Sequence, residues 1–383
     1  MELRFGGALI PAAVLTLALP ACGAQVPSTG EAVNPALPQA TAGVRHVRPL
    51  DSKSILKKLT KDITIGSTVD AQNGDQAPRA LYIAHGSPNG GLTKGQLVVC
   101  NFDDSGGNAG AGTTIEALNP KAGAKPQRFI QDAALEGCDG DAINPHDGSV
   151  YGTGLTSDKL VVIGKKGAIQ KTYGGKLFAD PFADLITDPK QNFSPLYVYV
   201  GTTGGTIVSV SVGFYGNGVA TEVAKGFATS KGSQGWLAPS GFQYDGQDDT
   251  LYIADGVTNT IVAFFNSSDL LDKDEIIVQP GGKTFKCRYP KTTCGTVVFS
   301  GSPLNAPVAS ALLPNGNLIV ANTQGTANTL VELTPAGKIL DTKVIDTSST
   351  QGVYGLVAKG TNDANTVLYY TDTNDNSVHE LTQ

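Results

Sequence analysis

Short apolar runs separated by turn-forming residues are the main pattern of this chain, and residues 239–265 show it clearly. There, Gly241–Tyr244, Leu251–Ala254 and Ile261–Phe265 are rich in aromatic and β-branched residues, with clusters of Gly, Asp, Asn and Thr between them. Runs of this length and composition predict the strands of a tight antiparallel meander. They are too short to be the long periodic segments that helices need.

The same pattern occurs six times along the chain. The second run of each copy begins at residue 81, 150, 196, 251, 318 or 368. In the first copy, the three strands are predicted at Thr68–Gln72, Leu81–His85 and Gln96–Cys100. Successive copies lie 46 to 69 residues apart. Because a blade usually repeats every 40 to 50 residues or so, we expect insertions in the loops.

One meander cannot bury both of its faces, so the copies must pack on one another. Six sheets of about four antiparallel strands, packed radially, make a six-bladed β-propeller, and this all-β fold is what the pattern predicts. A β-sandwich or a β-helix is the alternative. The long spacings and the recurring Leu-Tyr-Ile-Ala-Asp type of strand favour the propeller.

Strand Leu251–Asp255, followed by Asn259, resembles the repeat signature of the NHL family: strand, Asp, turn, Asn and next strand. Residues 301–322 resemble secreted bacterial NHL-type propellers, many of which have no known activity. The resemblance covers residues 60–383 and implies the propeller fold without naming a ligand.

Three strand-end residues recur with this signature, namely Asp255, Asn322 and Asp372. We expect them to accept hydrogen bonds in the turns that follow their strands. A ring of polar tips that binds a ligand is the alternative.

Residues 1–22 are predicted to be a lipoprotein signal peptide. Leu9–Leu19 is apolar but too short to span a bilayer, and Leu19-Pro-Ala-Cys22 is similar to the lipobox that precedes a lipidated cysteine. An ordinary secretory signal with an incidental Cys22 is the alternative. Residues 23–43, rich in Ala, Pro, Gly and Thr, predict a flexible tether, and residues 44–383 form the expected propeller domain.

The segment from Val44 to Thr60 is basic, but it does not predict nucleic-acid binding. The whole chain has 28 basic and 34 acidic residues, and its net charge is −6. The last copy ends at Gln383 soon after its third strand, which would leave an exposed edge. We therefore expect Val44–Leu50 or Ile55–Ile65 to supply the missing outer strand of that blade.

The four cysteines after Cys22 predict two disulfides in an exported chain. Cys287 and Cys294 enclose a short loop with Pro290 at its turn, so we pair them. Cys100 then pairs with Cys138. Zinc and c-type haem sites are disfavoured because the sequence has no Cys-x-x-Cys motif.

The sequence gives only weak signs of catalytic chemistry. The gluconolactonase and senescence-marker family resembles this fold, and its metal ligands are carboxylates and amides on inner strands. The matching positions here carry neither group: Gly140, Ala183, Ser240, Ala309 and Tyr354. Asp139, Asp141 and Asp184 lie nearby and form an alternative oxygen site for a divalent cation. Hydrogen bonding of these carboxylates to neighbouring backbone amides is the simpler interpretation.

Other catalytic motifs are missing from the sequence. The four histidines are isolated from one another: His46, His85, His146 and His379. No Gly-x-Ser-x-Gly elbow occurs. The glycine-rich stretch 106–112 lacks the Lys-Ser/Thr of a phosphate-binding loop.

Aromatic residues precede or open three of the predicted inner strands: Trp236, Phe182 and Tyr354. Together they would form a rim around one mouth of the propeller channel. Such a rim suits a sugar, a peptide or a loop of a partner protein. Packing between blades is the alternative.

These observations favour an exported, lipid-anchored, monomeric propeller that acts as a binding or scaffold module at the bacterial cell envelope. Its ligand is an unknown protein, glycan or small molecule, and no cofactor is expected beyond the possible divalent cation. The alternative function is a metal-dependent periplasmic hydrolase or lactonase that uses Asp139, Asp141 and Asp184.

Overall fold

The structure is a computed structural model that describes residues 53–86, 89–187, 196–212, 218–232 and 235–383. Of the two units of the chain, only the second, Ala42–Gln383, contains described residues. The predicted signal peptide, Cys22, the tether and the candidate strand Val44–Leu50 lie outside them. No helix in the described part of the chain is long and apolar enough to cross a membrane.

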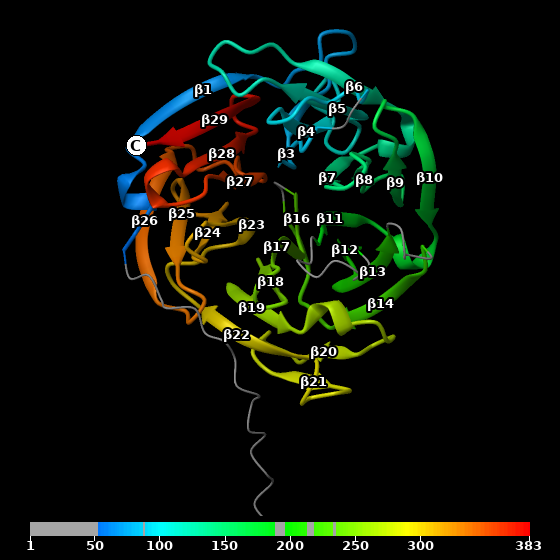
Figure 1. Ribbon diagram of the computed structural model, residues 1–383, viewed down its shortest axis with the longest axis vertical. Helices are drawn as coiled ribbons and strands as arrows, with labels where there is room; N and C mark the ends of the chain where they lie inside the picture. Colours follow the sequence, from blue (N-terminus) through cyan, green and yellow to red (C-terminus); the bar gives the residue numbers. More distant parts are fainter. Residues whose placement is uncertain (1–52, 87–88, 188–195, 213–217, 233–234) are drawn as a thin grey trace, which may run out of the picture. The chain divides into compact units, whose positions relative to one another are not determined.

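Unit Ala42–Gln383 is an all-β ring of six blades, so the predicted fold class is confirmed (Figure 1). The second and third blades consist of β7 (Cys138–Ile143), β8 (Val150–Gly154), β9 (Lys159–Ile163) and β10 (Ile169–Gly174), then β11 (Pro181–Ile186), β12 (Leu196–Thr202), β13 (Thr206–Val212) and β14 (Ala220–Lys225). In each blade the first strand is the innermost and the fourth is the outermost.

The fourth and fifth blades follow the same order. They consist of β17 (Pro239–Asp245), β18 (Thr250–Asp255), β19 (Thr260–Phe265) and β22 (Cys294–Ser300), then β23 (Pro307–Leu312), β24 (Leu318–Asn322), β25 (Asn328–Leu333) and β26 (Ile339–Asp346). Two insertions are associated with the fourth blade. They are the hairpin β15 (Ser230–Gly232) and β16 (Gly235–Leu237), and the arm β20 (Ile276–Val278) and β21 (Phe285–Cys287).

The N-terminal strand β1 (Lys61–Ser67) closes the ring. The sixth blade contains β27 (Leu356–Lys359), β28 (Val367–Asp372) and β29 (Ser377–Thr382), and β1 pairs antiparallel with β29. The register runs from Lys61 opposite Thr382 to Ser67 opposite Ser377. Closure by an N-terminal segment is thus confirmed, and the strand begins within the predicted range Ile55–Ile65 and ends two residues beyond it.

The strand assignment predicted for the first copy was wrong by one strand. Gln96–Cys100 belongs to the second strand, β4 (Leu97–Asp103), and Leu81–His85 overlaps the inner strand β3 (Tyr82–Ile83). The other inner piece is β2 (Gln76–Pro78), and the outer strands are β5 (Thr114–Leu118) and β6 (Gln127–Gln131). The predicted strand Thr68–Gln72 is instead a turn region, because the Asp70 carboxylate accepts the backbone N–H of Gln72 and Asn73.

The inner strand of the first blade is split into two short pieces, β2 and β3, and its sequence explains why. Ala77 has a positive φ of 61°, and Pro78 has no N–H to donate to a neighbouring strand. β2 and β3 therefore do not form one continuous apolar run. The apolar pattern consequently assigned β4 as the third strand of the blade, although it is the second.

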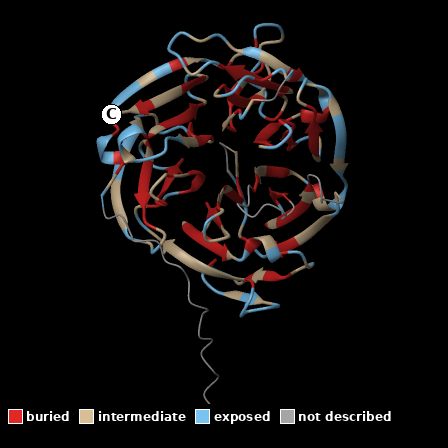
Figure 2. Ribbon diagram, viewed as in Figure 1, coloured by how far each residue is buried: buried red, intermediate tan, exposed pale blue. Residues whose placement is uncertain are grey.

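The core lies between adjacent blades. The strands nearest the centre of the ring are mostly buried, whereas the outer strands are largely half-buried or exposed (Figure 2). For example, Ile115 of the first blade packs in one buried cluster with Val150 and Val161 of the second. Burial of such apolar side chains between sheets is the main force that holds a propeller together.

Two disulfides are present, in agreement with the predicted pairs. Cys100 of β4 is bonded to Cys138 of β7, which joins the first two blades, and Cys287 is bonded to Cys294. The second bond holds the arm β20–β21 against β22. The same arm reaches the third blade, where β20 pairs parallel with β14. Two disulfides indicate an oxidising, extracytoplasmic environment.

The recurring strand-end residues have mainly structural contacts. Asp255 accepts hydrogen bonds from the backbone N–H of Val257 and Thr258, and Asp372 accepts one from Asn374. Asn322 differs, because its side chain accepts from Asn305 N–H and donates to Pro303 and Thr329. These contacts fit the predicted role in turns for the two aspartates.

Candidate functional site

A cavity of about 480 Å³ lies along the centre of the propeller, and the inner strands of all six blades line it. Four aromatic residues line it, namely Tyr82, Phe242, Tyr244 and Tyr354. Polar groups contribute too, from Gln243, Gln247 and Ser310. The Gln243 amide bridges two blades, since it donates to Ser310 O at 2.7 Å and accepts from Leu312 N–H at 3.2 Å.

Two of the three predicted acidic residues have buried carboxylates at the cavity wall. Asp141 lies on β7, and Asp184 lies on the neighbouring inner strand, β11. All four of their carboxylate oxygens are buried and have no hydrogen-bond partner within the described residues. Burial raises the pKa of both side chains well above the usual value, and the charge of Asp141 raises the pKa of Asp184 further.

Asp139, the third predicted acidic residue, has a different partner. Its Oδ2 lies 3.6 Å from Nη1 of Arg79, whose side chain is also almost fully buried. Burial raises the pKa of Asp139 to about 7, although the nearby Arg79 opposes the shift. Within the described residues, one group of three His, Cys, Asp or Glu side chains brings its possible metal-ligand atoms close together. That group does not include Asp139, Asp141 or Asp184.

Arg79 is held between two aromatic rings. Its guanidinium carbon lies 3.8 Å from the ring centre of Phe102 and 4.0 Å from that of Tyr354, so blades one and six both contact it. With Asp139 of the second blade, Arg79 ties three blades together at the end of the channel where the inner strands begin.

The hairpin β15–β16 covers the same end. It leads into the fourth blade, yet Gly235 lies against Arg79 of the first blade, on the opposite side of the ring. A Cβ placed on Gly235 would be 3.3 Å from both terminal nitrogens of Arg79. Figure 1 shows β16 near the middle of the ring, as this contact requires. The hairpin therefore reaches across this end of the channel, from the fourth blade to Arg79 of the first.

The three predicted rim residues lie near this end of the channel, but they do not form one continuous rim. Phe182 is only 3% exposed and packs with Phe102, Leu155 and Ala238, and Trp236 covers the same cluster. Of the three, Tyr354 alone lines the cavity, and its hydroxyl donates to Gln351. Phe182 and Trp236 thus pack between blades, which was the alternative to a rim.

The opposite end of the cavity is made of turns that follow the inner strands. Gln247 lies between β17 and β18, Pro314 lies between β23 and β24, and Gly360 follows β27. Asp245 lines the cavity beside this end.

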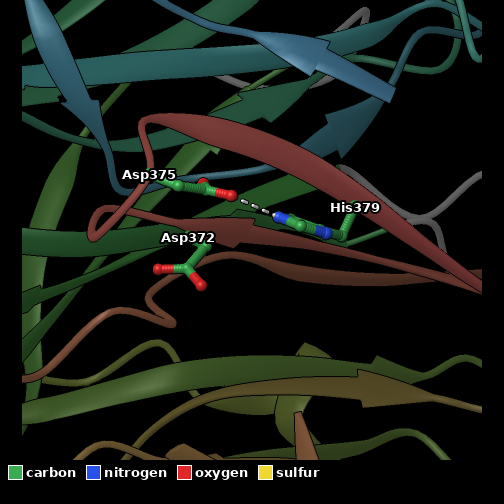
Figure 3. A group of neighbouring side chains, drawn as sticks. All are labelled: Asp372, Asp375 and His379. Atoms are coloured by element: carbon green, nitrogen blue, oxygen red, sulfur yellow. Dashed lines mark hydrogen bonds and ion pairs between the residues drawn. The ribbon is translucent and has the colours of Figure 1, made fainter. Parts of the chain in front are cut away.

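A second acidic cluster, which the sequence did not reveal, lies on the sixth blade. Asp372, Asp375 and His379 place three ligand-type atoms within 4.8 Å of one another (Figure 3). Both His379 ring nitrogens already have partners, with Nδ1 3.3 Å from Asp62 and Nε2 2.9 Å from Asp375. The only sequence signal was the alternation Asp375, Ser377, His379 at the start of β29.

His379 forms ion pairs with two carboxylates in this cluster. Burial lowers its pKa, but the hydrogen bonds to Asp375 and Asp62 outweigh burial and raise the pKa to about 9. The raised pKa favours the protonated imidazole, which donates a hydrogen bond to each carboxylate. We therefore assign Asp62, Asp375 and His379 to closing the ring, since Asp62 belongs to β1 and His379 to β29.

The other described histidines, His85 and His146, lie on the first and second blades. The His85 ring lies 6.1 Å from that of Tyr82, and the backbone N–H of His146 donates to Asn144. Four of the five residues compared with lactonase metal ligands line the cavity: Gly140, Ala183, Ala309 and Tyr354. Gly140 and Ala183 directly precede Asp141 and Asp184.

Comparisons with known proteins support the fold. No protein-family model matches the chain, and no curated protein matches it. Among solved structures, it is similar to a gluconolactonase of Xanthomonas campestris, with a TM-score of 0.56 and 11% identity over 88% of this chain and 97% of that one. It is also similar to a protein of unknown function from Bacteroides thetaiotaomicron (TM-score 0.54, 10% identity, 83% and 74% covered). A chain of a nidogen–laminin complex is similar as well (TM-score 0.51, 15% identity, 77% and 96% covered). Identities this low show a shared propeller fold alone.

Proposed function

We propose that this protein is an exported NHL-type binding module that takes a small polyhydroxylated ligand, such as a sugar, into its central cavity. One observation carries the proposal: inner-strand residues of all six blades line one central cavity, and aromatic and hydrogen-bonding residues are among them. The ligand enters from the end that carries Gln247, Pro314 and Gly360.

The size and chemistry of the cavity support a small ligand. Its volume, about 480 Å³, lies within the range of about 300–1,000 Å³ that is usual for ligand pockets. Aromatic faces such as Tyr82 and Tyr244 suit the C–H faces of a sugar ring, while Gln247 and Asp245 suit its hydroxyl groups. The net charge of −6 disfavours a nucleic acid.

Calorimetric titration with glucose, N-acetylglucosamine and cellobiose tests this proposal. At least one sugar should bind, and Tyr244→Ala, which removes an aromatic wall, should weaken it about tenfold. Tyr289→Ala is the matched control, because Tyr289 is 44% exposed and lies on the disulfide-bonded loop. Absence of heat with all three sugars, or equal weakening in both variants, contradicts the proposal.

Export and lipid anchoring at Cys22 are part of the same proposal. The apolar run and the lipobox-like sequence before Cys22 support them. In a bacterial host, Cys22→Ser should move the protein from the membrane fraction to the soluble fraction. Unchanged partitioning of the variant contradicts the anchor.

A metal-dependent lactonase is the second candidate, because Asp141 and Asp184 bring two unpartnered carboxylates to the cavity wall. Asp139 is paired with Arg79, so two carboxylates remain where a catalytic ion usually has three or more protein ligands. We expect no hydrolysis of gluconolactone with calcium, magnesium, manganese or zinc. Metal-dependent turnover that is lost in Asp184→Ala would replace the binding-module proposal with the enzyme.

A further inference from the structure

The arm β20–β21 is an addition to the common plan of the blades. In the second and fifth blades the third strand is followed directly by the fourth, whereas the arm separates β19 from β22 in the fourth blade. Figure 1 shows the arm at the outer edge of the ring. Additional segments on a rigid scaffold often carry function, so the side chains that the arm exposes indicate a role beyond completing the blade.

The arm is basic, although the chain as a whole is acidic. Residues 276–294 contain four cationic side chains and no Asp or Glu, whereas the net charge of the chain is −6. The four cations are all exposed: Lys283, Lys286, Arg288 and Lys291. Phe285 and Cys287 pack against the buried cluster beneath the arm, so Lys286 between them points outward.

Two exposed apolar side chains lie beside these cations. Only four large hydrophobic residues of the described chain are exposed, and Leu271 (51%) and Tyr289 (44%) are two of them. Asp272, next to Leu271, accepts a hydrogen bond from the Tyr289 hydroxyl at 2.7 Å and lies 3.6 Å from Arg288. Asp272 therefore balances one of the four positive charges. We call the resulting surface the arm tip, and it consists of Leu271, Lys286, Arg288, Tyr289 and Lys291.

The arm tip is held in place by a buried carboxylate and a disulfide. Glu275 accepts hydrogen bonds from the backbone N–H of Leu271 at 3.1 Å and of Asp272 at 3.0 Å. It also accepts one from the Thr293 hydroxyl, and the Cys287–Cys294 bond closes the turn that carries Tyr289. A surface that is ordered in advance loses little conformational entropy when it binds.

We propose that the arm tip binds the surface of a membrane that contains anionic lipids. Lipid phosphates attract the cations, while the Leu271 and Tyr289 side chains enter the boundary between headgroups and acyl chains. A protein partner fits less well, because a stable protein interface takes about 20 residues on each side. The arm tip is separate from the central cavity, so this inference stands whether or not a sugar binds there.

Sedimentation with lipid vesicles tests the arm tip. The protein carries Cys22→Ser, so that no lipid anchor contributes, and the vesicles contain phosphatidylcholine alone or mixed with phosphatidylglycerol. Neutral vesicles give the background from the apolar run Leu9–Leu19. Binding above this background should require phosphatidylglycerol. It should fall severalfold when salt is raised from about 0.1 M to about 1 M, because salt screens exposed charges.

Variants of the arm tip should weaken this binding. Lys286→Gln combined with Arg288→Gln should weaken it about 25-fold, at about fivefold for each cation lost. Leu271→Ser should weaken it without changing the charge. The matched control is Lys166→Gln combined with Lys171→Gln, because both lysines are exposed on the hairpin β9–β10 and the charge change is equal. The control should bind like the parent protein.

Three results overturn the proposal. The first is equal binding to neutral and anionic vesicles. The second is equal weakening in the arm-tip variant and the control. The third is binding to polyglutamate without binding to vesicles, which would assign the arm tip to an acidic protein instead.

The arm tip and the proposed lipid anchor are separable in cells, because salt releases a contact between charges but does not release an acyl chain. Membrane fractions of the Cys22→Ser protein are therefore washed at about 1 M salt before they are compared. Sugar titrations without vesicles test the proposed function alone. Failure of either proposal thus leaves the other standing.

Discussion

His379 stacks on Tyr370, with ring centres 4.9 Å apart, and lies between two carboxylates. Asp375 precedes it by four residues, but Asp62 lies 317 residues away in sequence. No spacing rule could predict this contact, because it exists only once β1 pairs with β29. In the sequence His379 is therefore isolated, and only the closed ring shows its contacts.

The charge of His379 predicts how stability depends on pH. Its folded pKa of about 9 lies above the ordinary value of 6.5, so its stabilisation is complete below about pH 6.5 and is lost as pH rises through 9. Burial tends to raise the pKa of Asp62 and Asp375, but hydrogen bonds to His379 lower both below the ordinary 3.8. Their contribution is present above about pH 3.8 and is lost on acidification through their lowered pKa values.

We expect His379→Gln to cost about 1 kcal/mol at pH 6 and almost nothing at pH 10, because the partners of His379 are partly exposed. Denaturant unfolding at pH 6, 8 and 10 measures this difference. His146→Gln is the control and should leave the pH profile unchanged. An equal cost of His379→Gln at all three pH values contradicts the assignment.

At the scale of strands, apolar alternation predicted the first three strands of five blades and failed in the first blade. It also gave no outer strands, and their sequences explain why. β26, for example, is half-buried or exposed along its whole length and includes Asp341 and Lys343. Such strands are specified by the neighbour they pair with, rather than by an apolar pattern of their own.

A second contact between distant parts of the chain involves the short helix η1 (Leu56–Lys58), just before β1. Buried Glu332 of β25 accepts hydrogen bonds from Ser54 Oγ at 2.7 Å and from Leu56 N–H at 2.8 Å. It also accepts from Ile55 N–H and from Asn317. One carboxylate thus holds the N-terminal segment on the fifth blade, before the chain reaches the sixth.

Glu332→Ala should therefore release this segment and cost about 3 kcal/mol, since it leaves several buried donors without an acceptor. Hydrogen exchange should become faster at the amides of Ile55 and Leu56. Glu136→Ala, at a half-buried site on the second blade, is the control. Unchanged exchange at Ile55 and Leu56 in Glu332→Ala shows that Glu332 does not hold the segment.

At the scale of the propeller, the sequence predicted six blades, ring closure and both disulfide pairs. The sequence placed Asp139, Asp141 and Asp184 near the channel. It could not show that Asp139 forms an ion pair with Arg79 whereas Asp141 and Asp184 do not. That distinction depends on three blades meeting at Arg79. The hairpin across the channel end was missed for the same reason, because Gly235 and Arg79 are neighbours only in the folded ring.

The two disulfides should contribute unequally to stability. Cys100–Cys138 spans 38 residues and joins two blades, whereas Cys287–Cys294 spans 7 residues. Chain entropy gives about 4 kcal/mol for the longer loop and about 2 kcal/mol for the shorter one. Unfolding of the two double Cys→Ala variants compares them directly. Equal losses, or a larger loss for Cys287–Cys294, contradict this expectation.

The hairpin that reaches across the channel to Arg79 has a kinetic consequence for the proposed ligand. A propeller channel open at both ends lets solutes pass through, but with the hairpin across one end, a bound sugar would leave by the route through which it arrived. Arrival and departure then share one passage, beside Gln247 and Pro314. A bulky group attached at that passage would slow both rates by the same factor and leave the equilibrium affinity unchanged.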